Sequence, residues 1–167
     1  MAKKLAIMSA LLGVMSGVSA NASVGSGLTA TQEIDLDVWS VIVNTVANHD
    51  IGRQGDAYSR DAILVIPKGT KKIAKALEKW GQDMVEAQAK GDTATVAFRF
   101  SHRQDNAETA FESGIFKYTE ITKSGTKTSM YVPFEQLLLK KNGKWRITME
   151  HQFPDVAQGD WDKLPPQ

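Results

Sequence analysis

The order of hydrophobic patterns along the chain predicts an α+β fold, with helices on one face of a curved antiparallel sheet. Apolar residues recur with a helical period in two segments, near residues 31–49 and 70–90. From residue 93 onward the period changes from 3.6 to 2, and turn residues divide this half into four strands. Helices grouped ahead of an antiparallel meander are typical of the α+β class.

The first predicted helix runs from about residue 31 to residue 49, and its apolar side chains form one stripe. Thr29 and Gln32 have the spacing of a capping box, which predicts where this helix begins. Trp39 lies at the edge of the stripe. The stripe itself consists of Ile34, Val38, Val41, Ile42 and Val46.

A short strand and a second helix come next. The run 63–66 is rich in β-branched residues and ends at Pro67, which predicts a buried strand. The helix expected over 70–90 contains Gly81, which costs about 1 kcal/mol relative to alanine. Gly91 has the position of a C-terminal stop. The buried face of this helix is predicted to hold Ile73, Leu77, Trp80 and Met84.

The second half of the chain predicts a meander of strands joined by hairpins. Asn142 and Gly143 both tolerate a positive φ, so they predict a tight hairpin between the last two strands. The tail from residue 156 to residue 167, which contains Pro165 and Pro166, is expected to be irregular. The four strands are expected at residues 95–103, 109–122, 126–140 and 145–153.

Composition excludes several classes of function. A chain of 167 residues predicts one domain, and 20 basic against 19 acidic residues give no basic surface for nucleic acid. The absence of cysteine excludes disulfides, thiolate zinc sites, iron–sulfur clusters and cysteine nucleophiles. His49, His102 and His151 lie far apart without metal-ligand spacing, and no glycine-rich phosphate loop is present. We therefore expect no cofactor, no metal and no nucleic-acid partner.

Residues 1–22 have the pattern of a secretory signal peptide. Lys3 and Lys4 precede an apolar run of roughly 14 residues, which is shorter than the ~20 needed to span a bilayer. Cleavage is expected after Ala22, with Ala20 as the alternative site, and a retained membrane anchor is the alternative to cleavage. The expected order is thus a signal peptide at 1–22, a spacer at 23–30, the α+β domain at 31–155 and the tail. The mature protein is expected to be periplasmic or extracellular, without membrane contact.

The order and spacing of several short motifs resemble the nuclear transport factor 2-like superfamily. More narrowly, they resemble the bacterial SnoaL-like and ketosteroid-isomerase-like proteins. An apolar strand, a lysine, a glycine turn and then Trp145 and Ile147 form the most specific of these motifs. The full set consists of Gly55-Asp56, the strand 61–64, Trp80, the stretch 110–114 with Tyr118, and the stretch 137–147.

This resemblance implies a cone-shaped α+β barrel, also described as a cystatin-like roll, with a pocket between the helices and the sheet. It also implies a homodimer formed through the outer face of the sheet. The family spans isomerases, cyclases, dehydratases, scaffolding domains and proteins without an assigned activity, so the fold does not settle the function.

Two residues are the candidates for catalysis. A pocket enzyme of this kind uses an acidic residue as base, with a tyrosine or a protonated acid beside the substrate carbonyl. Asp61 opens the first predicted strand and is expected near the pocket rim. Strict alternation along the last strand places His151 on the apolar face and Glu150 on the opposite face. For both Asp61 and His151, a plain structural role is the alternative.

Five further residues are candidates for ligand binding. Arg99 and Glu135 interrupt apolar strands, either as a cross-strand ion pair or as polar anchors in a pocket. Tyr58 is amphipathic and could donate into a pocket or serve in packing. Trp80 is a further candidate, with packing as its alternative role because it has the spacing of a core residue. Tyr131 completes the candidate set.

Three functions are consistent with these patterns. The leading hypothesis is an exported domain that binds a small, largely apolar molecule in the pocket. The alternatives are an isomerase- or dehydratase-like enzyme that uses the same pocket, and a non-catalytic dimerisation or interaction module. An enzyme requires a titratable group in a cavity of ~300 Å³ or more. An interaction module requires an exposed apolar patch on the sheet.

Overall fold

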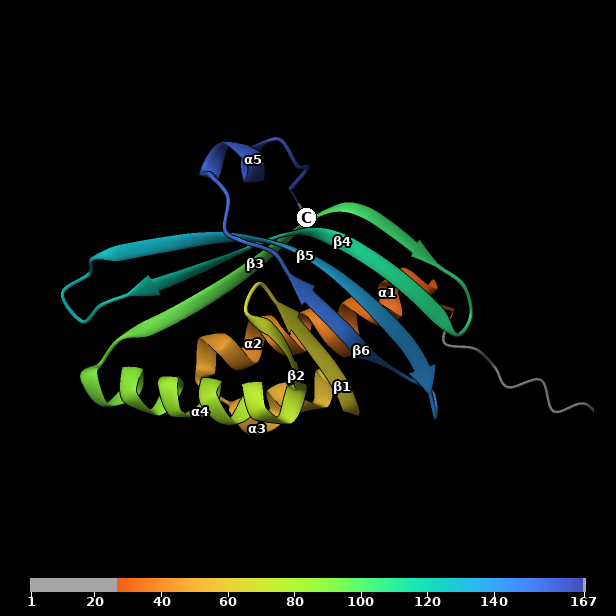
Figure 1. Ribbon diagram of the computed structural model, residues 1–167, viewed down its shortest axis with the longest axis horizontal. Coiled ribbons are helices and arrows are strands. Elements are labelled where there is room, and N and C mark those ends of the chain that lie inside the picture. Colours follow the sequence, from red (N-terminus) through yellow and green to blue (C-terminus); the bar gives the residue numbers. More distant parts are fainter. Residues whose placement is uncertain (1–26, 167) are drawn as a thin grey trace, which may run out of the picture.

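A six-stranded curved sheet with helices against its inner face makes up the part of the chain that the computed structural model describes, residues 27–166 (Figure 1). The predicted signal peptide lies outside these residues. The strands are β1 Tyr58–Ile66, β2 Gly69–Lys72, β3 Thr93–Asp105, β4 Thr109–Ile121, β5 Lys127–Lys141 and β6 Lys144–Gln152. The helical elements are α1 Ala30–Ile34, η1 Asp35–Trp39, α2 Ser40–Asn48, α3 Ile51–Gln54, η2 Gly55–Ala57, α4 Ile73–Lys90 and α5 Gln158–Asp162.

The sheet has the order β2–β1–β6–β5–β4–β3 and stays open at both edges. The α+β class and the four-strand meander predicted from the sequence are confirmed. The prediction of an all-antiparallel sheet is wrong at one place, because β1 runs parallel to β6. These two strands are separated in sequence by α4 and the meander, so no hairpin forces them to be antiparallel.

The N-terminal helix is continuous through α1, η1 and α2, in agreement with the helix predicted over 31–49. Thr29 accepts a hydrogen bond from the backbone of Gln32, and the Gln32 side chain accepts one from the Thr29 backbone. The capping box is therefore confirmed. The difference is η1, a π-helical turn within the helix, which ends at the buried Trp39.

The region around β1 differs more from the sequence prediction. β1 begins at Tyr58, and residues 69–72 pair with it as β2 instead of opening the second helix, which starts at Ile73. Ile63 is exposed while Ala62 and Leu64 are buried, so β1 is buried on one face only. A side chain at Gly81 would lie 3.2 Å from Ile51, which explains a glycine inside α4.

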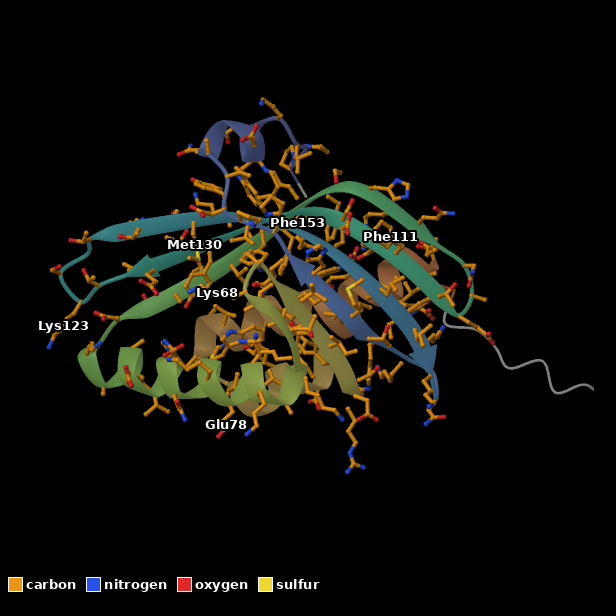
Figure 2. The ribbon with its side chains drawn as sticks, in the orientation of Figure 1. Lys68, Glu78, Phe111, Lys123, Met130 and Phe153 are labelled. Atoms are coloured by element: carbon orange, nitrogen blue, oxygen red, sulfur yellow. The ribbon has the colours of Figure 1, made fainter. Side chains whose placement is uncertain are left out.

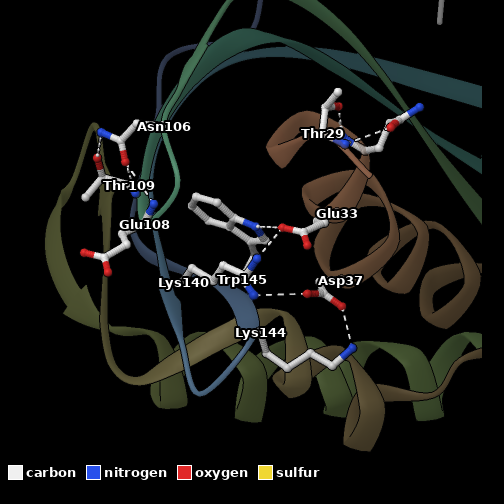
Figure 3. Close-up of polar contacts among 10 residues, drawn as sticks. Thr29, Glu33, Asp37, Asn106, Glu108, Thr109, Lys140, Lys144 and Trp145 are labelled. Carbon is white, nitrogen blue, oxygen red and sulfur yellow. Dashed lines mark hydrogen bonds and ion pairs between the residues drawn. The ribbon is translucent and has the colours of Figure 1, made fainter. Parts of the chain in front are cut away.

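Partly buried carboxylates tie the N-terminal helix to the β5–β6 hairpin (Figure 3). Glu33 accepts hydrogen bonds from the indole of Trp145, at 3.1 Å, and from the ammonium of Lys140. Asp37 accepts from the backbone of Trp145, at 3.1 Å, and from Lys144. Asn142 and Gly143 both have a positive φ in this hairpin, as the sequence predicts. The contacts fix one end of the helical layer against the sheet.

The C-terminal segment lies on the outer face of the sheet, opposite the helices (Figure 1). It contains the short helix α5, so the tail is not irregular throughout. Trp161 is buried there against Ile115 and Tyr131, and the Arg99 guanidinium donates to the backbone carbonyls of Trp161 and Leu164. No helix within residues 27–166 is long and apolar enough to cross a membrane.

Candidate functional site

A cavity of about 400 Å³ lies between the inner face of the sheet and the helices α2, α3 and α4. Figure 2 shows how side chains from both layers fill the space around it. Its walls are largely apolar and aromatic, with contributions from Trp80, Met84, Phe98, Phe116 and Tyr118. A volume of this size falls within the range of small-molecule sites.

A buried acid and a buried phenol lie side by side in this cavity. The Tyr58 hydroxyl donates to one carboxyl oxygen of Glu150 at 2.7 Å, and the Gln152 amide donates to the other at 2.5 Å. Burial raises the pKa of Glu150, although both hydrogen bonds favour its ionised form. Burial and the neighbouring Glu150 raise the pKa of the Tyr58 phenol well above its usual value. The pair combines a carboxyl that is protonated more readily than usual with a phenol that stays neutral.

A β-bulge in β6 brings Glu150 into the cavity. Leu137 pairs with Met149 and Leu138 pairs with Ile147, so Thr148 is an extra residue without a partner of its own. Trp145 and Ile147 lie in the core as predicted, but after the bulge the alternation is reversed. The predicted orientation of the strand end is therefore wrong: Glu150 faces inward and His151 faces outward.

Two glutamine side chains in the cavity carry unpaired acceptors. Gln54 is 6 % exposed and Gln136 is 2 % exposed, and both line the cavity. The Oε1 atom of each has no hydrogen-bond partner among the described residues. Buried amide oxygens are normally hydrogen-bonded, because an unpaired one keeps its desolvation cost. Neither oxygen is accessible to solvent, so an N–H or O–H group of a ligand would supply the missing donor only after the amide group turns toward the cavity.

The rim of the cavity is acidic. Its exposed lining residues are Asp83, Glu120 and Met130. Burial, and then the charges of Glu120 and Asp83, raise the pKa of Tyr118, which lines the same cavity. Both carboxylates therefore act on the space around the Tyr118 hydroxyl. A second cavity of about 250 Å³ adjoins this rim, and Asp83, Tyr118 and Glu120 are among the residues that line both cavities.

The structure places two of the seven candidate site residues in the cavity, Tyr58 and Trp80. Asp61 is on the opposite face of β1, where its side chain is 83 % exposed and pairs with Lys72 at 3.3 Å. His151 packs against Phe153 on the outer face, 3.6 Å from Glu135. The catalytic roles of Asp61 and His151 stay predictions that these positions do not favour.

Arg99 and Tyr131 also lie on the outer face, with the C-terminal segment. The cross-strand pair considered for Arg99 and Glu135 does not form, because β4 separates their strands. Arg99 instead approaches Asp162 at 3.7 Å and stacks over the Trp161 ring. Its role there is to hold the C-terminal segment on the sheet.

The sequence analysis did not select Gln54, Gln136 or Gln152 as site residues, and it placed Glu150 on the wrong face. One signal was available: Gln136 stands between Phe134 and Leu138 on the buried face of β5. A polar residue in the middle of an apolar face is unusual in a sheet that only packs. Within residues 27–166, no group of three or more His, Asp or Glu side chains could hold a metal ion.

Comparison with solved structures identifies the architecture. An NTF-2 like protein of unknown function from Shewanella oneidensis aligns with a TM-score of 0.60 and 13 % identity, over 74 % of this chain and 99 % of that one. A ketosteroid isomerase-like protein from Erwinia carotovora gives 0.54 and 17 %, over 75 % and 95 %. An NTF2-like superfamily protein from Salmonella enterica gives 0.57 and 16 %, over 77 % and 94 %.

No family model matches the chain, and no curated protein matches it in sequence. At these identities the structural likeness establishes architecture, while function depends on the side chains of the site. The curved sheet with the N-terminal helices on its inner face matches the folds of these proteins. The chain has the nuclear transport factor 2-like, or cystatin-like, α+β fold.

Proposed function

We propose that the chain binds a small, largely apolar molecule in the cavity between its helices and its sheet. The observation that carries this proposal is an apolar cavity of about 400 Å³ in which buried Gln54 and Gln136 each leave an acceptor unpaired. A cavity that serves only folding would be filled by side chains, as protein interiors are close-packed. The apolar walls supply affinity, and the few polar side chains of the lining orient the bound molecule.

The four tryptophans of the chain provide a test. 1-Naphthylmethanol, a neutral apolar probe, is titrated into isotope-labelled protein while the indole N–H signals are followed by NMR. Trp80 lines the cavity and Trp161 lies on the outer face, so the Trp80 signal should shift and the Trp161 signal should not. Single Trp→Phe variants assign the signals. If no indole signal shifts, or if Trp161 responds as strongly as Trp80, the proposal is wrong.

A pair of variants tests whether the cavity itself holds the probe. Val96 lines the cavity, so Val96→Phe should reduce its volume and weaken binding by at least about tenfold, or about 1.4 kcal/mol. Val85 is exposed on α4 and does not line the cavity, so Val85→Phe is the matched control and should bind normally. Dispersed indole signals in both variants show that each is folded.

A second candidate function is proton transfer without a cofactor. The observation that favours it is the raised pKa of Glu150 beside the neutral Tyr58 phenol inside the cavity. Such a carboxyl can accept a proton from a substrate carbon and return it to another, while a phenol donates to a carbonyl. In an enzyme of this kind Glu150→Gln abolishes turnover and keeps probe binding. Asp61→Ala and His151→Ala should leave that turnover unchanged. A loss of turnover in either variant would support the catalytic role that the sequence predicted for that residue.

We also propose that the protein is exported with residues 1–22 removed. The charged start, the apolar run and the small residues before Ala22 support this proposal. The mass of the protein recovered from the periplasmic fraction should correspond to cleavage after Ala22 or Ala20. Recovery of the uncleaved chain in the membrane fraction would indicate the retained anchor instead.

A further inference from the structure

All charged residues that line the cavity are acidic. Among the described residues, the lining contains Asp83, Glu120 and Glu150 and no lysine or arginine. Lys79 pairs with Asp83 but does not line the cavity. Glu120 forms no ion pair with any residue in the described part of the chain. Glu150 lies inside the cavity, while the exposed Asp83 and Glu120 lie at its rim beside apolar and aromatic walls, so the opening of the cavity carries negative charge.

The two rim carboxylates are placed beside aromatic side chains by regular secondary structure. Trp80 and Asp83 are three residues apart on α4, and they share one face of the helix. Tyr118 and Glu120 are two residues apart on β4, and they share one face of the sheet. Both pairs line the same cavity. A cation at the rim would meet two carboxylates close to two aromatic side chains, and aromatic rings also attract cations.

The interior of the cavity independently indicates a ligand that donates hydrogen bonds. The unpaired atoms of the nine-tenths buried Gln54 and Gln136 are both acceptors. In Glu150 both oxygens already accept hydrogen bonds, from Tyr58 and Gln152. A molecule whose polar groups are only acceptors, such as a carboxylate, would leave the two amide oxygens unpaired and face the negative rim. A molecule with N–H groups would not.

We propose that the ligand of this cavity is a cationic amphiphile, an apolar cyclic molecule with a protonated amine held at the rim by Asp83 and Glu120. This inference rests on the proposed binding function and names the chemical class of its ligand. The apolar body occupies the space lined by Trp80, Phe98 and Phe116. Donor groups on the body would pair with the amide oxygens of Gln54 and Gln136 once these amide groups turn toward the cavity.

Three probes of the same shape test the charge preference. 1-Naphthylmethylamine is cationic, 1-naphthylmethanol is neutral and 1-naphthoate is anionic, and each is titrated while the Trp80 indole signal is followed. The amine should bind at least about tenfold more tightly than the alcohol, because ion pairs with two rim carboxylates each add to the affinity. The naphthoate should bind more weakly than the alcohol.

A double variant connects the preference to the rim. Asp83→Asn with Glu120→Gln should lower the affinity for the amine to that for the alcohol, and should leave the affinity for the alcohol unchanged. Glu78→Gln is the matched control, because Glu78 is an acidic residue of α4 that points away from the sheet (Figure 2). It should keep the preference for the amine. Raised salt should weaken amine binding in the wild type more than alcohol binding.

The outcomes separate the two proposals. If the alcohol binds and the amine binds no more tightly, the charge preference is wrong while the binding function stands. The same conclusion follows if the double variant keeps the preference, or if the naphthoate binds best. If none of the three probes shifts the Trp80 signal, both proposals are wrong.

Discussion

Glu150 shows at the scale of one residue how burial and hydrogen bonding compete. Its carboxyl is buried among Tyr58, Gln152 and Gln136, and burial is the larger influence, so its pKa is raised above 4.5. The two donors that reach it lower the cost of ionisation but do not remove it. A buried acid that remains costly to ionise is better suited to a binding or proton-transfer site than to a purely structural role.

The raised pKa predicts how Glu150→Gln changes stability with pH. Below the unfolded pKa, near 4.5, the acid is neutral in both states and the variant should be close to wild type. As pH rises, the unfolded state ionises first, so the wild type loses stability until pH passes the folded pKa. The stability of the variant relative to wild type should therefore increase with pH, by about 1.4 kcal/mol for each pH unit that separates the unfolded pKa from the folded pKa.

Urea unfolding of both proteins across this pH range measures the difference. The exposed Glu78→Gln is the control, and its stability relative to wild type should stay nearly constant with pH. A constant difference for Glu150→Gln as well would contradict the raised pKa of the buried carboxyl.

The sequence could identify Glu150 as a strand residue but could not orient it. Strict alternation from Trp145 places Glu150 outside and His151 inside, and the bulge at Thr148 reverses both. A bulge inserts one residue into the ladder, and a single-residue slip moves every later side chain to the other face. No residue type in the stretch marks that insertion. The predicted catalytic residue His151 was therefore assigned to the wrong face of the strand.

At the scale of elements, Gly114 shows how two strands depend on one missing side chain. A Cβ at Gly114 would lie 2.1 Å from the carbonyl oxygen of Arg99 and 2.9 Å from the Cα of Phe100. β3 has a bulge directly after Phe100, where it pairs with Gly114. The close approach of the two backbones therefore requires glycine at this position.

Gly114→Ala should lower the free energy of unfolding by about 1–3 kcal/mol, because the backbone of β3 must move to admit the methyl group. Urea unfolding measures the change. Gly159→Ala is the control, because a Cβ there meets nothing within 4 Å. Its free energy of unfolding should be unchanged, or higher by up to about 1 kcal/mol because alanine has the better helix propensity in α5. Equal stability of Gly114→Ala and wild type would show that β3 shifts without cost.

Elements with a strong local signal could be predicted, and those without one could not. The capping box at Thr29, the stop at Gly91 and the hairpin at Asn142 each depend on local chemistry, and all three are confirmed. β2 has four exposed residues without alternation, so nothing local distinguishes it from the start of α4. Its structure comes from pairing with β1, a contact that a local pattern does not record.

At the scale of the whole molecule, the outer face of the sheet is divided in two. The C-terminal segment covers the half that holds Ile115 and Tyr131. On the other half, Ile63 of β1 and Leu137 of β5 are each 46 % exposed, and both pair with Met149 of β6. Leu139, two residues along β5, is also exposed. These neighbouring residues form an apolar patch across three strands, which is the feature required of a sheet-mediated interface.

We propose that two copies of the chain meet through this patch, as the resemblance implies. The wild type should then be a dimer by native mass spectrometry and light scattering. Leu137→Lys with Leu139→Lys should make it monomeric, because burying two charges in an apolar interface is costly. Val85→Lys, at an exposed apolar residue of α4, should stay dimeric. A monomeric wild type, or a double variant that remains dimeric, would exclude this face as the interface; the cavity is on the inner face, so naphthylmethanol binding should survive the double substitution.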